Sequence, residues 1–116
     1  MTTEFTNALD RFVALASAMS ADHFERNFPS LTPPRFRYEA GPKYVRIVRA
    51  DAIGSGQRSV HCFVRIADGA VLKAAGWKAP FIAKGGPECP ATVRGNIFAS
   101  DGGQDCLTVY GVKDAR

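Results

Sequence analysis

The first 28 residues place apolar side chains with the period of an α-helix. Over residues 3–19 these side chains recur at three- and four-residue steps, so they share one face of a helix. The residues of this face are Phe5, Leu9, Phe12, Val13, Ala16 and Met19. Thr2 or Thr3 can cap the helix start. Ser20 indicates either a second short helix or a kinked continuation, which ends before Pro29.

From residue 43 the apolar period changes to two, which is the pattern of half-buried strands. This pattern predicts strands over residues 43–50, 59–66, 70–75 and 106–112. The segment AIGSGQR (52–58) is predicted as a flexible hairpin loop and ADG (67–69) as a tight turn, because both carry turn-forming glycines. Residues 29–43 hold four prolines and therefore form a connector, with a short extended piece at RFRYE.

Alternation assigns the side chains of the first two strands to opposite faces. The first strand has Tyr44, Arg46 and Val48 on one face and Val45, Ile47 and Arg49 on the other. The second strand has Val60, Cys62, Val64 and Ile66 on one face and His61, Phe63 and Arg65 on the other. Residues 76–104 show little periodicity, so we expect either packed irregular structure or a working loop.

Together these elements predict the α+β class. We expect an N-terminal helix, or a helix pair, packed on an antiparallel sheet of four or five strands. At 116 residues the chain is a single domain, 1–116, in which residues 1–28 are helical and residues 43–112 are mainly antiparallel strands and loops.

Composition narrows the class of protein. With 46% hydrophobic and 22% charged residues the chain resembles an ordinary globular domain. It has no apolar run of the roughly 20 residues that cross a bilayer, and its N-terminus does not resemble a signal peptide. We therefore expect a cytoplasmic protein that does not contact membranes. The three cysteines are odd in number and lack a C-x2-C pair, so we expect reduced thiols, no metal site and no cofactor.

The charge of the chain is concentrated in its middle. The formal net charge is +4, but residues 35–94 hold eleven Lys and Arg against four Asp and Glu, a net charge of +7. A concentrated positive field attracts polyanions. The alternative is that the charge serves only solubility.

Aromatic and basic residues coincide in this segment. Such a surface is typical of single-stranded nucleic-acid binding, since bases stack on rings while phosphates meet cations. The candidate nucleic-acid-binding residues are Tyr44, Arg46, Arg49, Phe63, Arg65, Lys73, Trp77, Lys78 and Arg94. In the other interpretation, Phe63 and Trp77 are buried and the cations fringe a solvated sheet face.

Catalysis is not predicted. His61 adjoins Cys62, but consecutive strand residues point to opposite faces, so they are not expected to form a catalytic pair. A second arrangement, in which His23 reaches a thiol through the fold, stays open. The carboxylates are scattered and show no paired pattern.

Four stretches carry a resemblance to other proteins. The order KYVRIVR, RSVHCFV, DGAVLKAAGWKAP and VRGNIF resembles a group of small proteins encoded by bacteriophages and prophages. The resemblance covers residues 43–98 and implies an origin, because no activity is assigned to that group. An insertion, FIAKGGPECPAT (81–92), separates the last two stretches here.

We therefore predict a phage-type accessory protein that binds nucleic acid, single-stranded rather than duplex, without catalysis. Two alternatives remain. One is a phage inhibitor that docks on a host enzyme or defence protein, and the other is an oligomeric protein that sequesters a signalling nucleotide. The helix carries more apolar surface than one side of a small sheet needs, so a homo-oligomer through the N-terminal helix is also expected.

Overall fold

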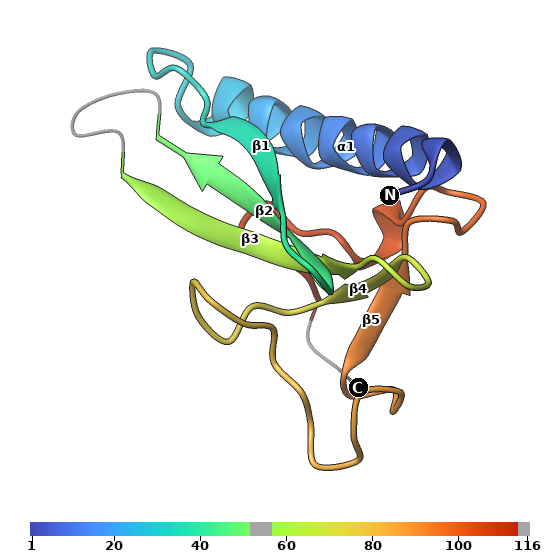
Figure 1. The fold of residues 1–116 in the computed structure, drawn as a ribbon. Coiled ribbons are helices and arrows are strands. Elements are labelled where there is room, and N and C mark those ends of the chain that lie inside the picture. Colours follow the sequence, from blue (N-terminus) through green and yellow to red (C-terminus); the bar gives the residue numbers. More distant parts are fainter. Residues whose placement is uncertain (52–56, 114–116) are drawn as a thin grey trace.

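One long helix and a five-stranded antiparallel sheet make up the fold, as Figure 1 shows for this computed structural model. The structure describes residues 1–51 and 57–113. Helix α1 spans Thr3–Asn27, and the strands are β1 (Arg35–Ala40), β2 (Tyr44–Ala50), β3 (Arg58–Arg65), β4 (Ala70–Leu72) and β5 (Val93–Asn96). A short 3-10 helix, η1, spans Gln104–Cys106. The predicted α+β class and helix-on-sheet arrangement are confirmed.

Helix α1 is continuous where a second helix or a kink was the expectation. The Thr2 hydroxyl accepts a hydrogen bond from the Phe5 amide at 3.0 Å, so the predicted N-terminal cap is confirmed. Ser20 is fully buried within the helix and caps nothing. No glycine or proline interrupts residues 3–27, so nothing forces a break, and the helix ends beside Phe28, just before Pro29.

The strands lie side by side in the order in which they occur along the chain, β1-β2-β3-β4-β5. The extended piece predicted at RFRYE is confirmed as β1, which pairs with β2. The predicted strands 43–50 and 59–66 correspond to β2 and β3, and the third predicted strand is confirmed only over Ala70–Leu72. The predicted hairpin loop 52–58 falls mostly on residues 52–56, which lie outside the described residues.

The C-terminal part of the strand prediction was wrong. β5 lies inside the segment predicted to be irregular, at Val93–Asn96. Residues 106–112, predicted as a strand, do not form one: Cys106 ends η1, and a tight turn joins Leu107 and Val112, which form an isolated antiparallel bridge. In this turn the Gly111 amide donates to the Thr108 hydroxyl at 3.0 Å and the Thr108 amide donates to the Gly111 carbonyl at 2.9 Å. A side chain that satisfies its own local backbone competes with strand pairing.

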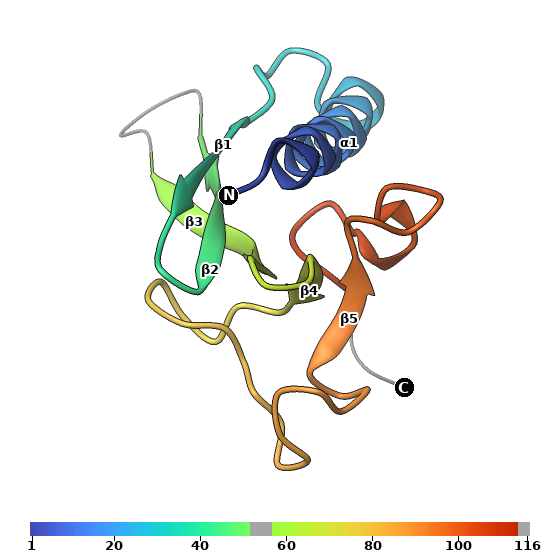
Figure 2. The ribbon, with the colours of Figure 1, turned by 45° about the vertical axis from the view of Figure 1, so that its right-hand side comes forward.

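The main core lies between α1 and the sheet. Leu9 and Phe12 of the helix are fully buried together with Val45, Ile47 and Val64 of β2 and β3. Figure 2 shows α1 along one side of the sheet, with the segment after β5 beside it. That segment approaches the helix closely at Gly103, where a β-carbon would lie 2.9 Å from the Phe12 ring.

The other face of the sheet, called here the outer face, has a smaller apolar cluster. Phe63, Ala70 and Leu72 are buried there, with Tyr44 and Val60 packed against them. The long connection between β4 and β5 runs on this side, away from α1 (Figure 1). The outer face is therefore the side on which residues of the sheet and of the long connection meet.

Candidate nucleic-acid interface

The outer face brings together four of the predicted binding residues. Arg46 of β2 lies opposite Phe63 of β3, and Tyr44 lies opposite Arg65. Their side chains alternate with Val45 and Val64, which face the helix. The predicted shared face of Tyr44 and Arg46 is confirmed. Phe63 and Arg65 also share a face, but His61, which was predicted to join them, contacts Phe36 on the helix side instead.

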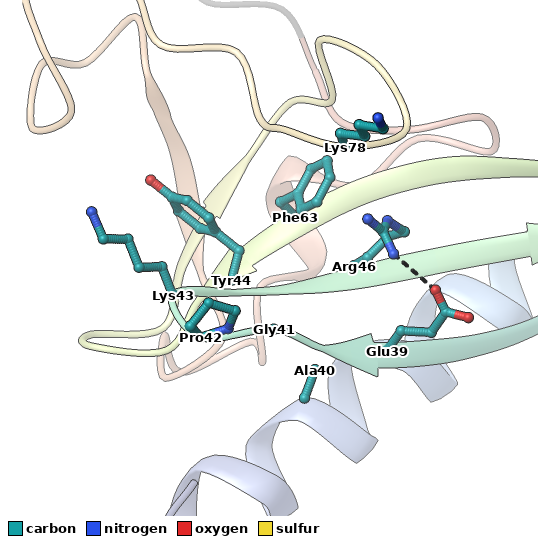
Figure 3. A pocket seen from close by; sticks show the side chains of 9 residues that line it. All are labelled: Glu39, Ala40, Gly41, Pro42, Lys43, Tyr44, Arg46, Phe63 and Lys78. Carbon is teal, nitrogen blue, oxygen red and sulfur yellow. Dashed lines mark hydrogen bonds and ion pairs between the residues drawn. The ribbon is translucent and has the colours of Figure 1, made fainter.

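A groove of about 310 Å³ crosses this face. Its floor is formed by Tyr44, Arg46 and Phe63, and one wall is the connection 41–43 between β1 and β2. Lys78, from the long connection, lies at the other wall. Figure 3 shows Glu39 and Arg46 at one end of the groove and Tyr44 with Lys43 at the other.

The aromatic rings of the groove differ in exposure. Phe63 is 3% exposed, and Tyr44 contacts it edge-on with ring centroids 6.3 Å apart. The expectation that Phe63 stacks on a base was therefore wrong, because its ring packs on Leu72 and Ala70 in the outer cluster. Tyr44 is half-buried and Trp77 is 38% exposed, so these two rings remain accessible.

Arg46 links the sheet to the segment that carries Trp77. Its Nη1 donates to Glu39 Oε1 at 2.9 Å, and its Nε donates to the Trp77 carbonyl at 2.7 Å. The same guanidinium lies 4.8 Å from the centroid of the Trp77 ring, within the range of a cation–π contact. Arg46 thus fixes the indole beside the groove and keeps a positive charge there.

Two residues of this arrangement were missed by sequence reasoning. Arg58 places its guanidinium 5.5 Å from the Trp77 ring centroid, but it had been assigned to the hairpin loop. Plain alternation places Arg58 on the face of Cys62 and Val64, and only the extra residue His61 brings Arg58 to the outer face. Glu39 accepts hydrogen bonds from Arg37 and Arg46, and these bonds lower the pKa of its carboxyl group.

Arg65 has a different role from the one predicted. Its side chain is 11% exposed and donates to both oxygens of Asp68, at 2.9 and 2.7 Å. It also donates to Glu88 at 3.1 Å and to the Pro87 carbonyl at 3.0 Å. The hydrogen bond from Arg65 lowers the pKa of Asp68. Arg65 therefore anchors the long connection, and its charge is matched by two carboxylates.

Three predicted residues lie apart from the groove. Arg49 faces the helix side of the sheet, with its guanidinium 5.3 Å from the Tyr110 ring centroid. Lys73 lines a separate hollow beside His61 and Tyr110. Arg94 on β5 donates to the Lys113 carbonyl at 2.9 Å. The prediction that these three join Arg46 in one site was wrong, because they lie on the other face or on distant parts of the sheet.

A second hollow adjoins the groove at Tyr44. It measures about 490 Å³ and shares Pro42, Lys43 and Tyr44 with the groove. Arg65 and the segment Pro87–Glu88 form its far side. Tyr44 therefore stands between two adjoining hollows, and Lys43 borders both.

His61 and Cys62 are in contact, contrary to the expectation from strand alternation. The register between β2 and β3 shifts so that Ile47 pairs with Cys62 and Val48 with Val60, which makes His61 an extra residue. In this β-bulge, His61 Nδ1 lies 3.4 Å from Cys62 Sγ, and Nε2 lies 3.1 Å from the Thr108 carbonyl. Because a carbonyl only accepts, Nε2 carries the proton of the neutral ring, and the thiol donates to Nδ1.

Burial disfavours the charged forms of this pair. It lowers the pKa of His61 and raises the pKa of Cys62 well above its usual value. Burial also raises the pKa of Cys106 to about 11. The half-buried Cys89 differs, because a hydrogen bond with Thr92 lowers its pKa. All three cysteines are free thiols, and His23 contacts Tyr110 and Asn27.

Within the described ranges 1–51 and 57–113, no three His, Cys, Asp or Glu side chains gather closely enough to hold a metal ion. The helices in those ranges lack the combination of length and apolar content that crossing a bilayer requires.

Comparison with known proteins gives one match. The model of a family described as a family of unknown function (DUF7717) matches residues 2–110. No curated protein and no solved structure matches the chain. The family description names neither an activity nor a source, so the phage resemblance stays a prediction.

Proposed function

The chain belongs to the family of unknown function DUF7717, and we propose that it binds single-stranded nucleic acid, without catalysis, on the outer face of its sheet. One observation carries this proposal. Tyr44 lines a groove together with the cations Arg46, Lys43 and Lys78, and the accessible ring of Trp77 lies next to this groove, 4.8 Å from the Arg46 guanidinium.

The two kinds of side chain would act on different parts of the strand. Unpaired bases stack on Tyr44 and Trp77, each base contributing about 1–3 kcal/mol. The ammonium groups of Lys43 and Lys78 meet phosphates and release the counterions condensed on them. Further cations extend the same face beyond the groove. These are Arg35 and Arg37 of β1, which share the outer face with Glu39, and Arg58 of β3.

A single strand fits this face better than a duplex. Duplex recognition places a helix or a two-stranded ribbon in a major groove about 12 Å wide. The outer face instead offers a hollow bordered by rings, which can stack only with bases that are not paired. Burial raises the pKa of Cys62 and of Cys106, so neither of these two thiols is expected to act as a nucleophile.

The proposal is tested by the salt dependence of binding. A fluorescein-labelled twelve-residue oligonucleotide is titrated with the protein at several salt concentrations and followed by anisotropy. The logarithm of the affinity should fall linearly with the logarithm of the salt concentration, with a slope of about −0.7 for each phosphate contacted. Emission of Trp77, the single tryptophan, should change on binding.

Matched variants locate the binding face. Lys43→Gln with Lys78→Gln should weaken binding and reduce the salt slope by about 1.4, the value for two phosphates. The control, Arg26→Gln with Lys113→Gln, removes two exposed cations away from the groove and should leave both values unchanged. Binding that is absent, insensitive to salt, or equally weakened by both pairs of substitutions would overturn the proposal.

A mononucleotide is the other ligand that this groove could take. Sequestering of a signalling nucleotide would need one nucleotide to stabilise the fold specifically, by mass action. A melting-temperature screen of cyclic and linear mononucleotides separates the two. Stabilisation by one mononucleotide, with no gain in affinity for longer oligonucleotides, favours the sequestering function.

A separate observation favours a protein partner. Phe28, Leu31 and Tyr110 are 43%, 47% and 64% exposed, and His23 contacts both Phe28 and Tyr110 edge-on. These residues form an apolar patch at the end of the N-terminal helix. We propose that a phage-type accessory protein uses this patch to contact a host protein or a second copy of itself. Light scattering of the wild type and of Phe28→Ser should show a change in mass if the patch joins two copies.

A further inference from the structure

The two hollows beside Tyr44 adjoin one another, and together they are called the trough. The groove of about 310 Å³ and the hollow of about 490 Å³ each reach the lower range of small-molecule sites. They share Tyr44 and Lys43, so a ligand that fills both passes over the Tyr44 ring beside the Lys43 ammonium. Two adjoining hollows of this size with a ring between them match two successive units of a chain molecule.

Each hollow also contains a carboxylate. Glu39 lines the groove, and Glu88 lines the second hollow. Each Glu39 oxygen accepts a hydrogen bond from one arginine, and a carboxylate has about four acceptor positions, which leaves about two. The Glu88 side chain is 77% exposed and gives one oxygen to Arg65.

These carboxylates decide which part of a nucleotide enters each hollow. A phosphate diester oxygen only accepts hydrogen bonds, so a phosphate cannot fill the remaining acceptor positions of Glu39 and Glu88. Lys43 borders both hollows and attracts the phosphate that connects two nucleotides. The bases then point toward the carboxylates, which accept hydrogen bonds but donate none.

We propose that the trough holds two successive nucleotides, one base on each side of Tyr44, and selects bases with an exocyclic amino group. This inference rests on the proposed function and adds a specificity to the same site. Cytosine presents its N4 amino group to a carboxylate, as is common in base recognition. Thymine presents the O4 oxygen at the same position, and two acceptors repel each other.

The test compares two oligonucleotides that differ only in this group. Labelled twelve-residue oligodeoxycytidylate and oligodeoxythymidylate are titrated at one low salt concentration, followed by anisotropy. The wild type should bind the cytidylate about tenfold more tightly. Glu39→Gln and Glu88→Gln should each reduce this ratio, because a glutamine amide can donate to O4 of thymine as well as accept from cytosine. The double variant should bring the ratio close to one.

The ratio of the cytidylate affinity to the thymidylate affinity distinguishes a loss of specificity from the general effect of removing a negative charge. Glu25→Gln removes an exposed carboxylate on α1 and should leave the ratio at the wild-type value. Tyr44→Ala should weaken binding of both oligonucleotides about tenfold, since both bases lose the same ring. Melting temperatures verify that each variant is folded. Glu88→Gln changes an exposed residue of the long connection, so it tests the second hollow without a change in the groove.

The outcomes distinguish this inference from the proposed function. Salt-dependent binding with an equal affinity for both oligonucleotides, or a ratio that the two glutamine variants leave unchanged, overturns the specificity and leaves single-strand binding in place. A thymidylate preference also overturns it. Absence of binding to either oligonucleotide overturns both.

Discussion

On the helix side of the sheet, Val45, Ile47 and Val64 are fully buried against Leu9 and Phe12 of α1. The residues that alternate with them along the same strands point the other way, so the outer face carries Tyr44 and Arg46 beside the buried Phe63. The helix side thus holds the larger apolar core, and the outer face combines a small apolar cluster with arginines held by acids and carbonyls.

The difference separates the part of the molecule that stabilises it from the part that can bind. Burial of apolar side chains gives about 1.5–3 kcal/mol for each large residue, whereas an exposed ion pair gives about 0–1 kcal/mol. Removing side chains from the helix side should therefore act mainly on stability. Removing side chains from the outer face should lower the stability less than on the helix side, and it should displace Trp77 more.

The largest effect is expected from Phe12→Ala. Phe12 is fully buried, and Gly103 packs closely against its ring, so the truncation leaves a cavity between α1 and the C-terminal segment. The free energy of unfolding in urea should fall by about 3–5 kcal/mol. Asn7→Ala, on the exposed side of the same helix, is the control and should change it by less than about 0.5 kcal/mol. Equal losses of unfolding free energy in Phe12→Ala and Asn7→Ala would contradict the view that the helix side stabilises the molecule.

A smaller loss is expected from Leu72→Ala on the outer face. Leu72 is fully buried but belongs to a cluster with only two other fully buried members among the described residues, Phe63 and Ala70. Its truncation should lower the free energy of unfolding by about 2–3 kcal/mol, the lower part of the range for Leu→Ala. A loss as large as that of Phe12→Ala would show that the outer face is a second core and not a supporting layer.

Arg46→Met tests the link between the sheet and Trp77. The substitution removes the hydrogen bond to the Trp77 carbonyl and the bond to Glu39 while keeping an unbranched apolar stem in place of the aliphatic part of the arginine. Stability should fall by about 1–2 kcal/mol, and Trp77 emission should shift as the indole loses its nearest guanidinium. Arg37→Met removes the other partner of Glu39 and should leave the emission unchanged. An unchanged emission in Arg46→Met would show that Arg46 does not position the ring.

The smallest effect is a pH dependence that arises on the helix side. Burial lowers the pKa of His61, and the nearby Arg49 charge lowers it further, while the bond to the Thr108 carbonyl opposes this. Below about pH 6.5 His61 therefore binds a proton more readily in the unfolded chain than in the folded chain, and stability falls as pH decreases. The free energy of unfolding is measured between pH 7.5 and pH 5, above the pH range in which carboxyl groups titrate. It should fall with decreasing pH in the wild type, and it should fall less in His61→Phe.

The first half of the fold could be predicted because its signals are local and repeated. The spacing of Phe5, Leu9 and Phe12 is that of a helix, and the alternation of Tyr44 to Arg49 is that of a strand. β5 could not be predicted, because all four of its residues are half-buried and show no alternation. The same holds for Thr108, whose hydroxyl turns the chain back through a contact that period-two patterns do not reveal.

The candidate site was predicted only in part, for a comparable reason. Alternation placed Tyr44 and Arg46 on one face, and it also placed Arg49 on the opposite one. It could not foresee the extra residue His61, which moves the faces of β3 out of step before and after it. Nor could it show that Arg65 is occupied by Asp68 and Glu88, since those contacts depend on how the long connection returns to the sheet.

The sequential order of the strands has a kinetic consequence. Each strand pairs with the one that precedes it, so the sheet can grow by hairpins that close mostly short loops and lose little chain entropy at each step. Pairing between strands that follow one another in the chain makes the contacts of the sheet more local, which favours faster folding. The contacts that join distant parts of the chain, such as Arg11 with Ser100, form when the last segment meets the helix. The apolar side of the sheet is therefore covered completely only once the segment after β5 has packed on α1.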